Sequence, residues 1–339
     1  YQAIYTNTTG ASLSAVGVGA LYANTTGSNS VAMGASSLVS NTTGAYNTGL
    51  GRDALRNNTT ASENTAVGYQ AGYSNTTGAY NQSFGVYAGY SNTTGLRNTA
   101  LGYSANFANS TGSYNTVVGM QALNDNTASN NTAVGYRAGY SNTTGSNNIA
   151  IGYVALNDAT TASDNIAIGS NALAANTTGD RNTAIGSLAM ITNSTGSFNT
   201  AIGAGQAGII QGALGLNTTG SNNTAVGYTS LRSNTTAGAN TAVGYAAMYD
   251  NSTGQFNLAS GYLSLENNTT GSYNTALGAL ALDGNTTASS NTAVGYQAGY
   301  SNSTGSGNSI VGYQAGYSMT TAANAVLMGR EAGYSITTA

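Results

Sequence analysis

Apolar and polar residues alternate in blocks along this 339-residue chain, and the blocks recur about every 17 residues. Each unit has a short apolar segment ending in glycine, as in Asn64-Thr65-Ala66-Val67-Gly68, then a tyrosine-containing segment and a polar Asn-Thr-Thr-Gly segment. The closing glycines, here termed landmark glycines, are Gly17, Gly34, Gly51, Gly68, Gly85, Gly102, Gly119, Gly135, Gly152, Gly169, Gly186, Gly203, Gly227, Gly244, Gly261, Gly278, Gly295, Gly312 and Gly329. Successive landmarks are 17 residues apart, except for one step of 16 to Gly135 and one of 24 to Gly227.

This period predicts one coil of a parallel β-solenoid or β-roll per unit. Seventeen residues are too few for a helix pair or a propeller blade, and Val, Ile, Thr and Tyr favour strands. We predict a first strand over Asn-Thr-Ala-Val, a corner at the landmark glycine, a second strand over the tyrosine-containing segment and a wide turn over Ser-Asn-Thr-Thr-Gly-Ser. The fold class is therefore all-β, with about nineteen coils that stack about 4.8 Å apart into a rod roughly 90 Å long.

The repeat spans the whole chain, so we predict one continuous array over residues 1–339 with an insertion at 204–216. Both ends lack a polar capping coil, which solenoids normally need. We therefore expect both ends to be open and the chain to be part of a longer fibre; the alternative is end-to-end polymerisation.

The expected core is thin. The residue before each landmark glycine, such as Val67 or Ile151, is the main large apolar position, and alanine two residues before the glycine lies on the opposite strand face. Ordering one coil costs about 25 kcal/mol, which requires on the order of 1,000 Å² of buried apolar area. One valine and a few alanines fall short of this area, so we expect self-association through the alanine face.

Several segments resemble the head repeat of trimeric autotransporter adhesins: residues 29–34 (NSVAMG), 131–135 (NTAVG), 148–152 (NIAIG) and 165–169 (NIAIG). That family's N-S-V-A-I-G signature belongs to a left-handed parallel β-roll built as a homotrimer, and similar repeats occur in phage and viral tail fibres. The resemblance implies a homotrimeric fibre. This sequence departs from the family in its longer period and in its added Asn-Thr-Thr-Gly turn.

The composition excludes much chemistry. The chain has no His, Cys, Pro or Trp, its seven basic residues are all Arg, and its formal net charge is −3. It therefore has no imidazole base, thiolate or zinc-finger ligand set, and too little positive charge to bind nucleic acid. No apolar run reaches the roughly 18 residues that span a membrane. We expect no enzyme activity, catalytic residue, cofactor or metal.

The polar turn contains repeated Asn-Thr-Thr or Asn-Ser-Thr sequences that match the N-glycosylation acceptor pattern. We predict glycans along one edge of the fibre; the alternative is that asparagine suits the turn and stacks as a hydrogen-bonded ladder. The candidate residues, here termed the turn asparagines, are Asn7, Asn24, Asn41, Asn58, Asn75, Asn92, Asn109, Asn142, Asn176, Asn193, Asn217, Asn234, Asn251, Asn268, Asn285 and Asn302.

Tyrosines recur at the first and fifth positions after the landmark glycines, as at Tyr69 and Tyr73 or Tyr296 and Tyr300. Such an array binds sugars through its ring faces or, in the interpretation that we favour, packs coil against coil.

Threonine recurs at the start of the first predicted strand and could order water, as in ice-binding solenoids, although Ile149, Ile166 and Leu258 interrupt this row. The aspartates are scattered and lack the G-G-x-G-x-D spacing of calcium-loaded rolls. The closest carboxylate pair, Asp158 and Asp164, is expected to be solvated, and the insertion is expected to be a surface loop or bulge rather than a partner site.

These observations favour a non-enzymatic extracellular fibre shaft, structural or adhesive, with glycans on its turns, on a cell or virion surface. Its expected partners are copies of itself, with a surface carbohydrate or receptor as a further candidate. A tail-fibre shaft that spaces a receptor-binding tip is the first alternative, and an ice-binding solenoid is the second.

Overall fold

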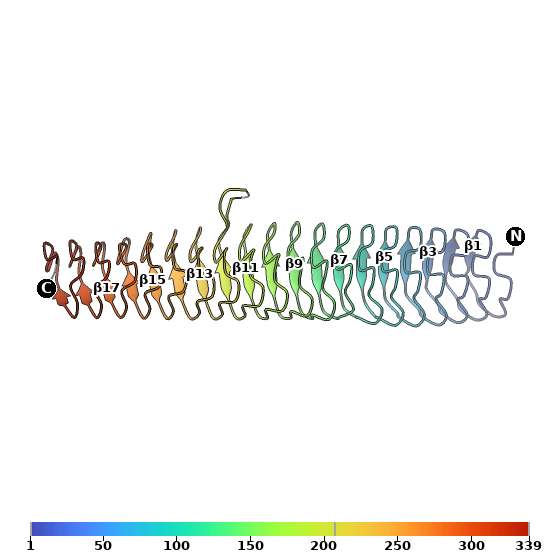
Figure 1. Ribbon diagram of the computed structural model, residues 1–339. Helices are drawn as coiled ribbons and strands as arrows, with labels where there is room; N and C mark the ends of the chain where they lie inside the picture. Colours follow the sequence, from blue (N-terminus) through green and yellow to red (C-terminus); the bar gives the residue numbers. More distant parts are fainter. Residues whose placement is uncertain (1, 207, 338–339) are drawn as a thin grey trace. The chain divides into compact units, whose positions relative to one another are not determined.

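A computed structural model describes residues 2–206 and 208–337. Contacts divide the chain into two compact units, Tyr1–Asp164 and Asn165–Ala339. In both units every coil contributes one three-residue strand, and the described residues contain no helix. Figure 1 shows the strands stacked coil upon coil within each unit. The predicted all-β parallel β-solenoid is confirmed, while the single continuous array and the homotrimer stay predictions.

Each described strand ends at the residue before a landmark glycine. The strands of the first unit are β1 (Ser14–Val16), β2 (Val31–Met33), β3 (Thr48–Leu50), β4 (Thr65–Val67), β5 (Gln82–Phe84), β6 (Thr99–Leu101), β7 (Thr116–Val118), β8 (Thr132–Val134) and β9 (Ile149–Ile151). The strands of the second unit are β10 (Ile166–Ile168), β11 (Thr183–Ile185), β12 (Thr200–Ile202), β13 (Thr224–Val226), β14 (Thr241–Val243), β15 (Leu258–Ser260), β16 (Thr275–Leu277), β17 (Thr292–Val294), β18 (Ser309–Val311) and β19 (Val326–Met328).

The strand register aligns equivalent residues of successive coils. Within each unit, each strand pairs in parallel with the strand of the next coil, so that Ala184 lies opposite Ala201 and Ile185 opposite Ile202. Positions at the same distance from their landmark glycines therefore form rows along each unit, here termed ranks. The coils of 16 and 24 residues keep this register, since Val117 pairs with Ala133 and Ala201 pairs with Ala225.

The landmark glycines form the corners, as predicted. Gly68 has φ +137°, a conformation that L side chains rarely adopt, and a Cβ there would lie 2.5 Å from the carbonyl oxygen of Gly85. Two conditions therefore require glycine here. The bend needs a backbone conformation that L side chains rarely adopt, and the next coil occupies the space that a side chain would fill.

The predicted second strand is wrong. The segment after the corner is a turn in which every second residue is left-handed, as with Gln70 (φ +54°) and Gly72 (φ +59°) or Asp53 (φ +59°) and Leu55 (φ +49°). A strand needs extended residues throughout, whereas this alternation coils the backbone. The segment still bonds to its neighbour: the Leu55 amide donates to the carbonyl of Ala71 over 3.0 Å.

The predicted core faces are reversed. Alanine two residues before the landmark glycine is buried, as at Ala66 and Ala184, whereas the residue before the glycine faces outward, with Val16 61% exposed and Leu101 48% exposed. The larger core side chains come instead from the fourth position after the corner, such as Leu265. The inward strand position also accepts larger side chains, since Val117 and Ile310 occupy it and are fully buried, so side-chain size alone does not decide which strand face lies inside. The predicted contact between chains through the buried alanine face is therefore wrong.

Candidate functional site

The turn asparagines form a hydrogen-bonded ladder inside the coils. Asn58 is representative: its Nδ2 donates to Oδ1 of Asn41 in the preceding coil over 2.8 Å and to the carbonyl of Ala61 in its own turn over 3.0 Å. Asn251 and Asn268 repeat this geometry in the second unit. The amide therefore both closes its own turn and joins it to the coil before.

Fifteen of the sixteen turn asparagines are buried, and Asn7 is partly buried. Glycosylation replaces an N–H on Nδ2, the atom that donates both hydrogen bonds along the ladder. Glycans at these positions stay a prediction, and in the folded coil they compete with those hydrogen bonds. The geometry assigns the asparagines the structural role that the sequence left as the alternative.

Two of the places where the ladder is interrupted are coils without a turn asparagine. Ala159 and Met319 occupy its place and are fully buried. The preceding asparagines, Asn142 and Asn302, then meet no amide in the next coil, and their Oδ1 atoms lack a hydrogen-bond partner. A third interruption is the step from Asn92 to Asn109, where Oδ1 of Asn92 also lacks a partner. Replacement by apolar residues is the sequence signal that this turn position faces inward.

A second asparagine ladder, which the sequence reasoning missed, lies directly before most of the strands. Asn64 is representative: its Nδ2 donates to the carbonyl of Gly78 over 2.9 Å, and its Oδ1 accepts from the backbone amide of Asn81 over 2.8 Å. The same pattern recurs in the second unit at Asn240. The recurrence of asparagine at the first position of the Asn-Thr-Ala-Val-Gly segment is the signal that could have revealed it.

The tyrosines stack along their ranks. In the second unit the rings of Tyr228, Tyr245 and Tyr262 follow one another with centroids 5.5 and 5.3 Å apart, and those of Tyr300, Tyr317 and Tyr334 with centroids 5.1 and 5.0 Å apart. Because neighbouring rings cover one another's faces, these ladders present mainly ring edges to solvent. Their geometry fits packing between coils better than stacking on sugars.

The outer face of the strands carries two ranks. Threonine lies at the strand start and an apolar residue lies before the corner, and both point away from the buried alanine between them. The longest described run of threonines in register is Thr183, Thr200, Thr224 and Thr241. The result is a row of hydroxyls beside a row of partly exposed Val and Ile side chains.

The carboxylates predicted to be solvated do not form a common site. Asp158 accepts from Nδ2 of Asn157 in the same coil, and Asp164 accepts from Nδ2 of Asn147 over 3.1 Å. Among the described residues, no three His, Cys, Asp or Glu side chains form a group that could hold a metal ion.

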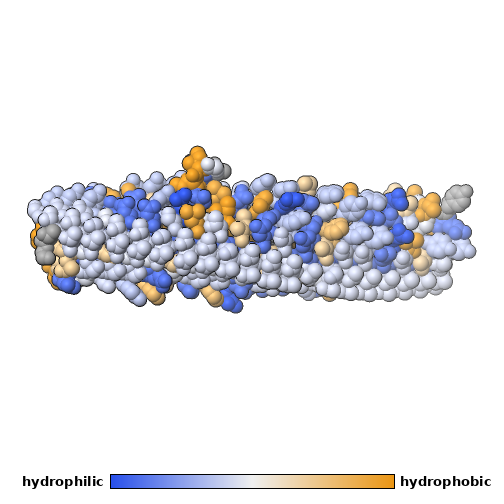
Figure 2. Space-filling view, viewed as in Figure 1, coloured by the Kyte–Doolittle hydropathy of each residue, from blue (hydrophilic) through white to orange (hydrophobic). Residues whose placement is uncertain are grey.

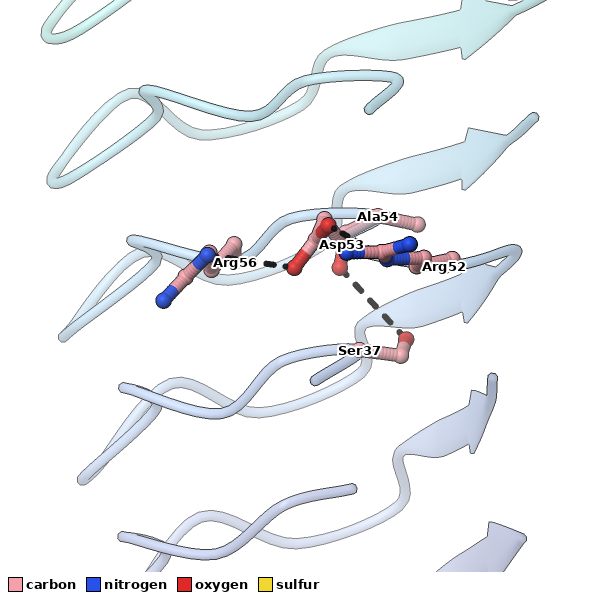
Figure 3. A network of polar contacts seen from close by, with 5 residues as sticks. All are labelled: Ser37, Arg52, Asp53, Ala54 and Arg56. Atoms are coloured by element: carbon pink, nitrogen blue, oxygen red, sulfur yellow. Dashed lines mark hydrogen bonds and ion pairs between the residues drawn. The ribbon is translucent and has the colours of Figure 1, made fainter. Parts of the chain in front are cut away.

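Asp53 is the carboxylate with the clearest ionic partners. Figure 3 shows it between Arg52 and Arg56, at N–O distances of 3.2 and 3.3 Å, while Ser37 Oγ donates to the Ala54 carbonyl beside it. The Asp53 side chain is almost fully buried, Arg52 is largely exposed and Arg56 is about half-buried. The two arginines compensate the charge of a carboxylate that projects from a left-handed residue.

Glu266 and Asp283 form the opposite case, a carboxyl pair in adjacent coils. The two side chains are within hydrogen-bonding range of each other. Burial and the neighbouring Glu266 raise the pKa of Asp283 to about 7, and burial together with Asp250 raises the pKa of Glu266. The charge of Asp283 also raises the pKa of Tyr300 in the next coil.

In the second unit, the described residues of the insertion form a hairpin. The chain leaves the coil after Gly203, Gln206 and Ile210 form an antiparallel bridge, and the Ala213 amide returns to the carbonyl of Gly203. Ile209 is 72% exposed at the tip, and a cavity of about 310 Å³ lies between the hairpin and Leu188. Figure 2 shows the apolar patch where this hairpin projects.

Comparison with known proteins adds no relative: no family model, no curated protein and no solved structure matches this chain. In the part of the chain that the structure describes, no helix has the length and apolar character needed to cross a membrane.

Proposed function

We propose that this chain is a non-enzymatic extracellular fibre shaft. In this role it acts mechanically, as a spacer of defined length, and its outward ranks form the surface that contacts other molecules. The observation that carries the proposal is the double asparagine ladder, which repeats in both units and joins each coil to its neighbours through buried hydrogen bonds.

The ladders support a mechanical role for a physical reason. Backbone amides bond to the next coil on the strand side, as from Thr65 to Asn81, and on the turn side, as from Thr59 to Thr76. A coil is thus held at its strand, its corner segment and its turn, and each added coil adds the same set of bonds. Stability of such a stack grows with repeat number.

Self-association belongs to this proposal, with the contact moved to the outer strand face. The residues before the corners keep apolar side chains exposed at Val16, Met33 and Leu101 in the first unit and at Ile202 and Val243 in the second. Their burial between chains would supply apolar area that the narrow interior lacks. A homotrimer of the adhesin-head type is the arrangement that the sequence resemblance favours, and the tail-fibre shaft places the same spacer on a virion.

Whole-coil deletion tests the shaft. Removing residues 224–257, two complete 17-residue coils, joins Asn223 to Leu258 and keeps the repeat in frame. We expect a folded protein whose longest dimension, measured by small-angle X-ray scattering, falls by about 10 Å. Removing residues 224–231 is the matched control, because it breaks the frame and should disrupt folding. An unchanged dimension or an unfolded whole-coil variant would contradict the proposal.

A second candidate is ice binding, favoured by the four threonines in register from Thr183 to Thr241. It predicts thermal hysteresis that is lost in a Thr200→Leu, Thr224→Leu double variant. No hysteresis in the parent protein at millimolar concentration would reject it.

A further inference from the structure

One rank of the second unit concentrates charge. The fifth residues after the landmark glycines of five successive coils are Arg232, Tyr249, Glu266, Asp283 and Tyr300. Arg232 lies over the Tyr249 ring, 5.3 Å from its centroid, and donates to Oε1 of Gln211 over 2.7 Å. The only arginine of this rank is therefore engaged elsewhere, and the aromatic coil of Tyr249 lies between it and Glu266.

Glu266 and Asp283 are thereby left as two carboxylates in adjacent coils. Among the acidic residues of the chain, they are the two that occupy the same rank in neighbouring coils, which are about 4.8 Å apart. Asp250, one coil before Glu266, adds a third negative charge, and its amide donates to the Glu266 carbonyl over 2.9 Å. Like charges at this spacing repel unless a positive species lies between them.

The burial of the Asp283 carboxylate is a second, independent observation that points to a ligand. Asp283 is only 9% exposed, and its buried Oδ1 has no hydrogen-bond partner. Its coil is anchored to the preceding one, since Asn267 Nδ2 donates to the Asp283 carbonyl over 2.9 Å. A buried acceptor without a donor, beside a second carboxylate, is the environment that a cation fills.

We propose that Glu266 and Asp283 bind a hard divalent cation, Ca²⁺, between the coils that follow β15 and β16. Carboxylate oxygens are preferred ligands of Ca²⁺, which takes its remaining ligands from carbonyls and water. Glu266 is partly exposed, so water reaches one side of the pair. With two carboxylates as the main ligands, the expected Kd is on the order of 10⁻⁴ to 10⁻³ M.

Bound Ca²⁺ acts as a clamp between two coils. It replaces repulsion across the Glu266–Asp283 step by attraction to a shared ion, and it satisfies Oδ1 of Asp283. Binding to the folded chain alone shifts the unfolding equilibrium by mass action, so the midpoint of thermal unfolding rises with calcium concentration.

The experiment uses the full chain at pH 8, freed of metal with EDTA and dialysed. Calcium chloride from 0.1 to 10 mM is added in calorimetric titration and in thermal unfolding followed by circular dichroism, with sodium chloride of equal ionic strength as the salt control. We expect a saturable heat and a rising Tm for the parent. Glu266→Gln and Asp283→Asn should lose both responses, while Asp125→Asn, which changes a carboxylate on another rank, should keep them.

Both site variants remove repulsion and are expected to fold, which their spectra without calcium will show. Equal responses in the parent and the Asp283→Asn variant would overturn the proposal. So would a parent whose Tm ignores calcium but rises on acidification from pH 8 to 5, with Asp283→Asn abolishing that rise. That result would mean that a proton alone bridges the pair, because a carboxyl whose pKa is raised in the folded state stabilises it at low pH.

Discussion

The interior of each coil has two ends, one at the Asn-Thr-Thr-Gly turn and one at the segment that follows the landmark glycine. The residues at the turn end repeat more strictly than those at the corner end. At the turn end, the turn asparagines occupy nearly every coil, and their amides bond to the same residue one coil away. At the corner end, the fourth position after the landmark glycine holds Leu265 in one coil, Met248 in another, Gly72 or even Asn106 elsewhere. Directional hydrogen bonds require identical partners, whereas apolar packing requires only a suitable volume.

The corner end also shows how volume is shared between coils. A Cβ at Gly72 would lie 3.0 Å from Cδ2 of Leu55, so the leucine of one coil already extends into the space at the next. Where Gly89 and Asn106 follow each other without leucine, Oδ1 of Asn106 is buried and has no partner. The apolar end thus tolerates variation at some cost, and the polar end largely excludes it.

The largest effect is expected from breaking the corner that both ends share. Gly244→Val places a branched side chain at φ +138°, against the backbone of Gly261. We expect a loss of about 4 kcal/mol or more in the free energy of unfolding, measured by urea denaturation. Gly208→Ala is the control: it lies in the hairpin at φ +76° with open space around it, and should cost only about 1–2 kcal/mol. Equal losses would show that stacking at the corner is unimportant.

A cavity at the apolar end should rank next. Leu265→Ala empties a fully buried position and should cost about 3 kcal/mol, whereas Leu265→Met should cost less than about 1.5 kcal/mol because it keeps the volume. Leu263→Ala, partly exposed in the same coil, controls for the loss of an apolar side chain. The comparison between the two ends fails if Met is as damaging as Ala.

The polar end should reject a volume-conserving change. Asn251→Leu removes the donor to Asn234 Oδ1 and the Gly254 carbonyl, and the acceptor for Asn268 Nδ2. We expect a loss of about 2–3 kcal/mol in urea denaturation. Asn222→Ala is the control, since Asn222 is exposed and Ala239 adopts the same left-handed conformation one coil later. A near-neutral Asn251→Leu would mean that volume governs both ends.

The smallest effect is a gain. Ala159→Asn should restore the missing rung, with its Nδ2 donating to the unpartnered Oδ1 of Asn142. We expect stabilisation of about 1 kcal/mol, seen as a higher urea midpoint at unchanged slope. Ala159→Ser, which is too short to reach the ladder, is the matched control, and destabilisation by Asn beyond that of Ser would contradict the ladder as drawn.

Expression in a host that attaches N-glycans tests the acceptor prediction separately. Intact mass before and after enzymatic glycan removal is compared with the 33.7 kDa polypeptide. Burial predicts that Asn7, the least enclosed turn asparagine, is the most favourable acceptor. Equal glycan occupancy at Asn251 would show that attachment precedes formation of the ladder.

The sequence by itself determined the repeat, the strand before each landmark glycine and the glycine corner. The period and the recurring glycine are both apparent from the order of the amino acids, and glycine is the residue that a corner without room for a Cβ requires. It did not determine which way the side chains point. Val67 and Ala66 alternate in any strand, and only the closed coil decides that Ala66 is buried and that Val67 lies on the outer face.

The same limit applies to the candidate sites. Asn-Thr-Thr reads identically in a glycan acceptor and in a buried ladder, since the difference lies in the partner 17 residues away and in the direction of the amide. The 17-residue spacing of Glu266 and Asp283 puts them on one rank, but the burial of Asp283 and its unpartnered Oδ1 are found only in the folded coils. The sequence determines which chemical groups each coil carries. The burial of those groups and their distances to other charges depend on residues that are distant in sequence, so they are decided only when one coil lies against the next.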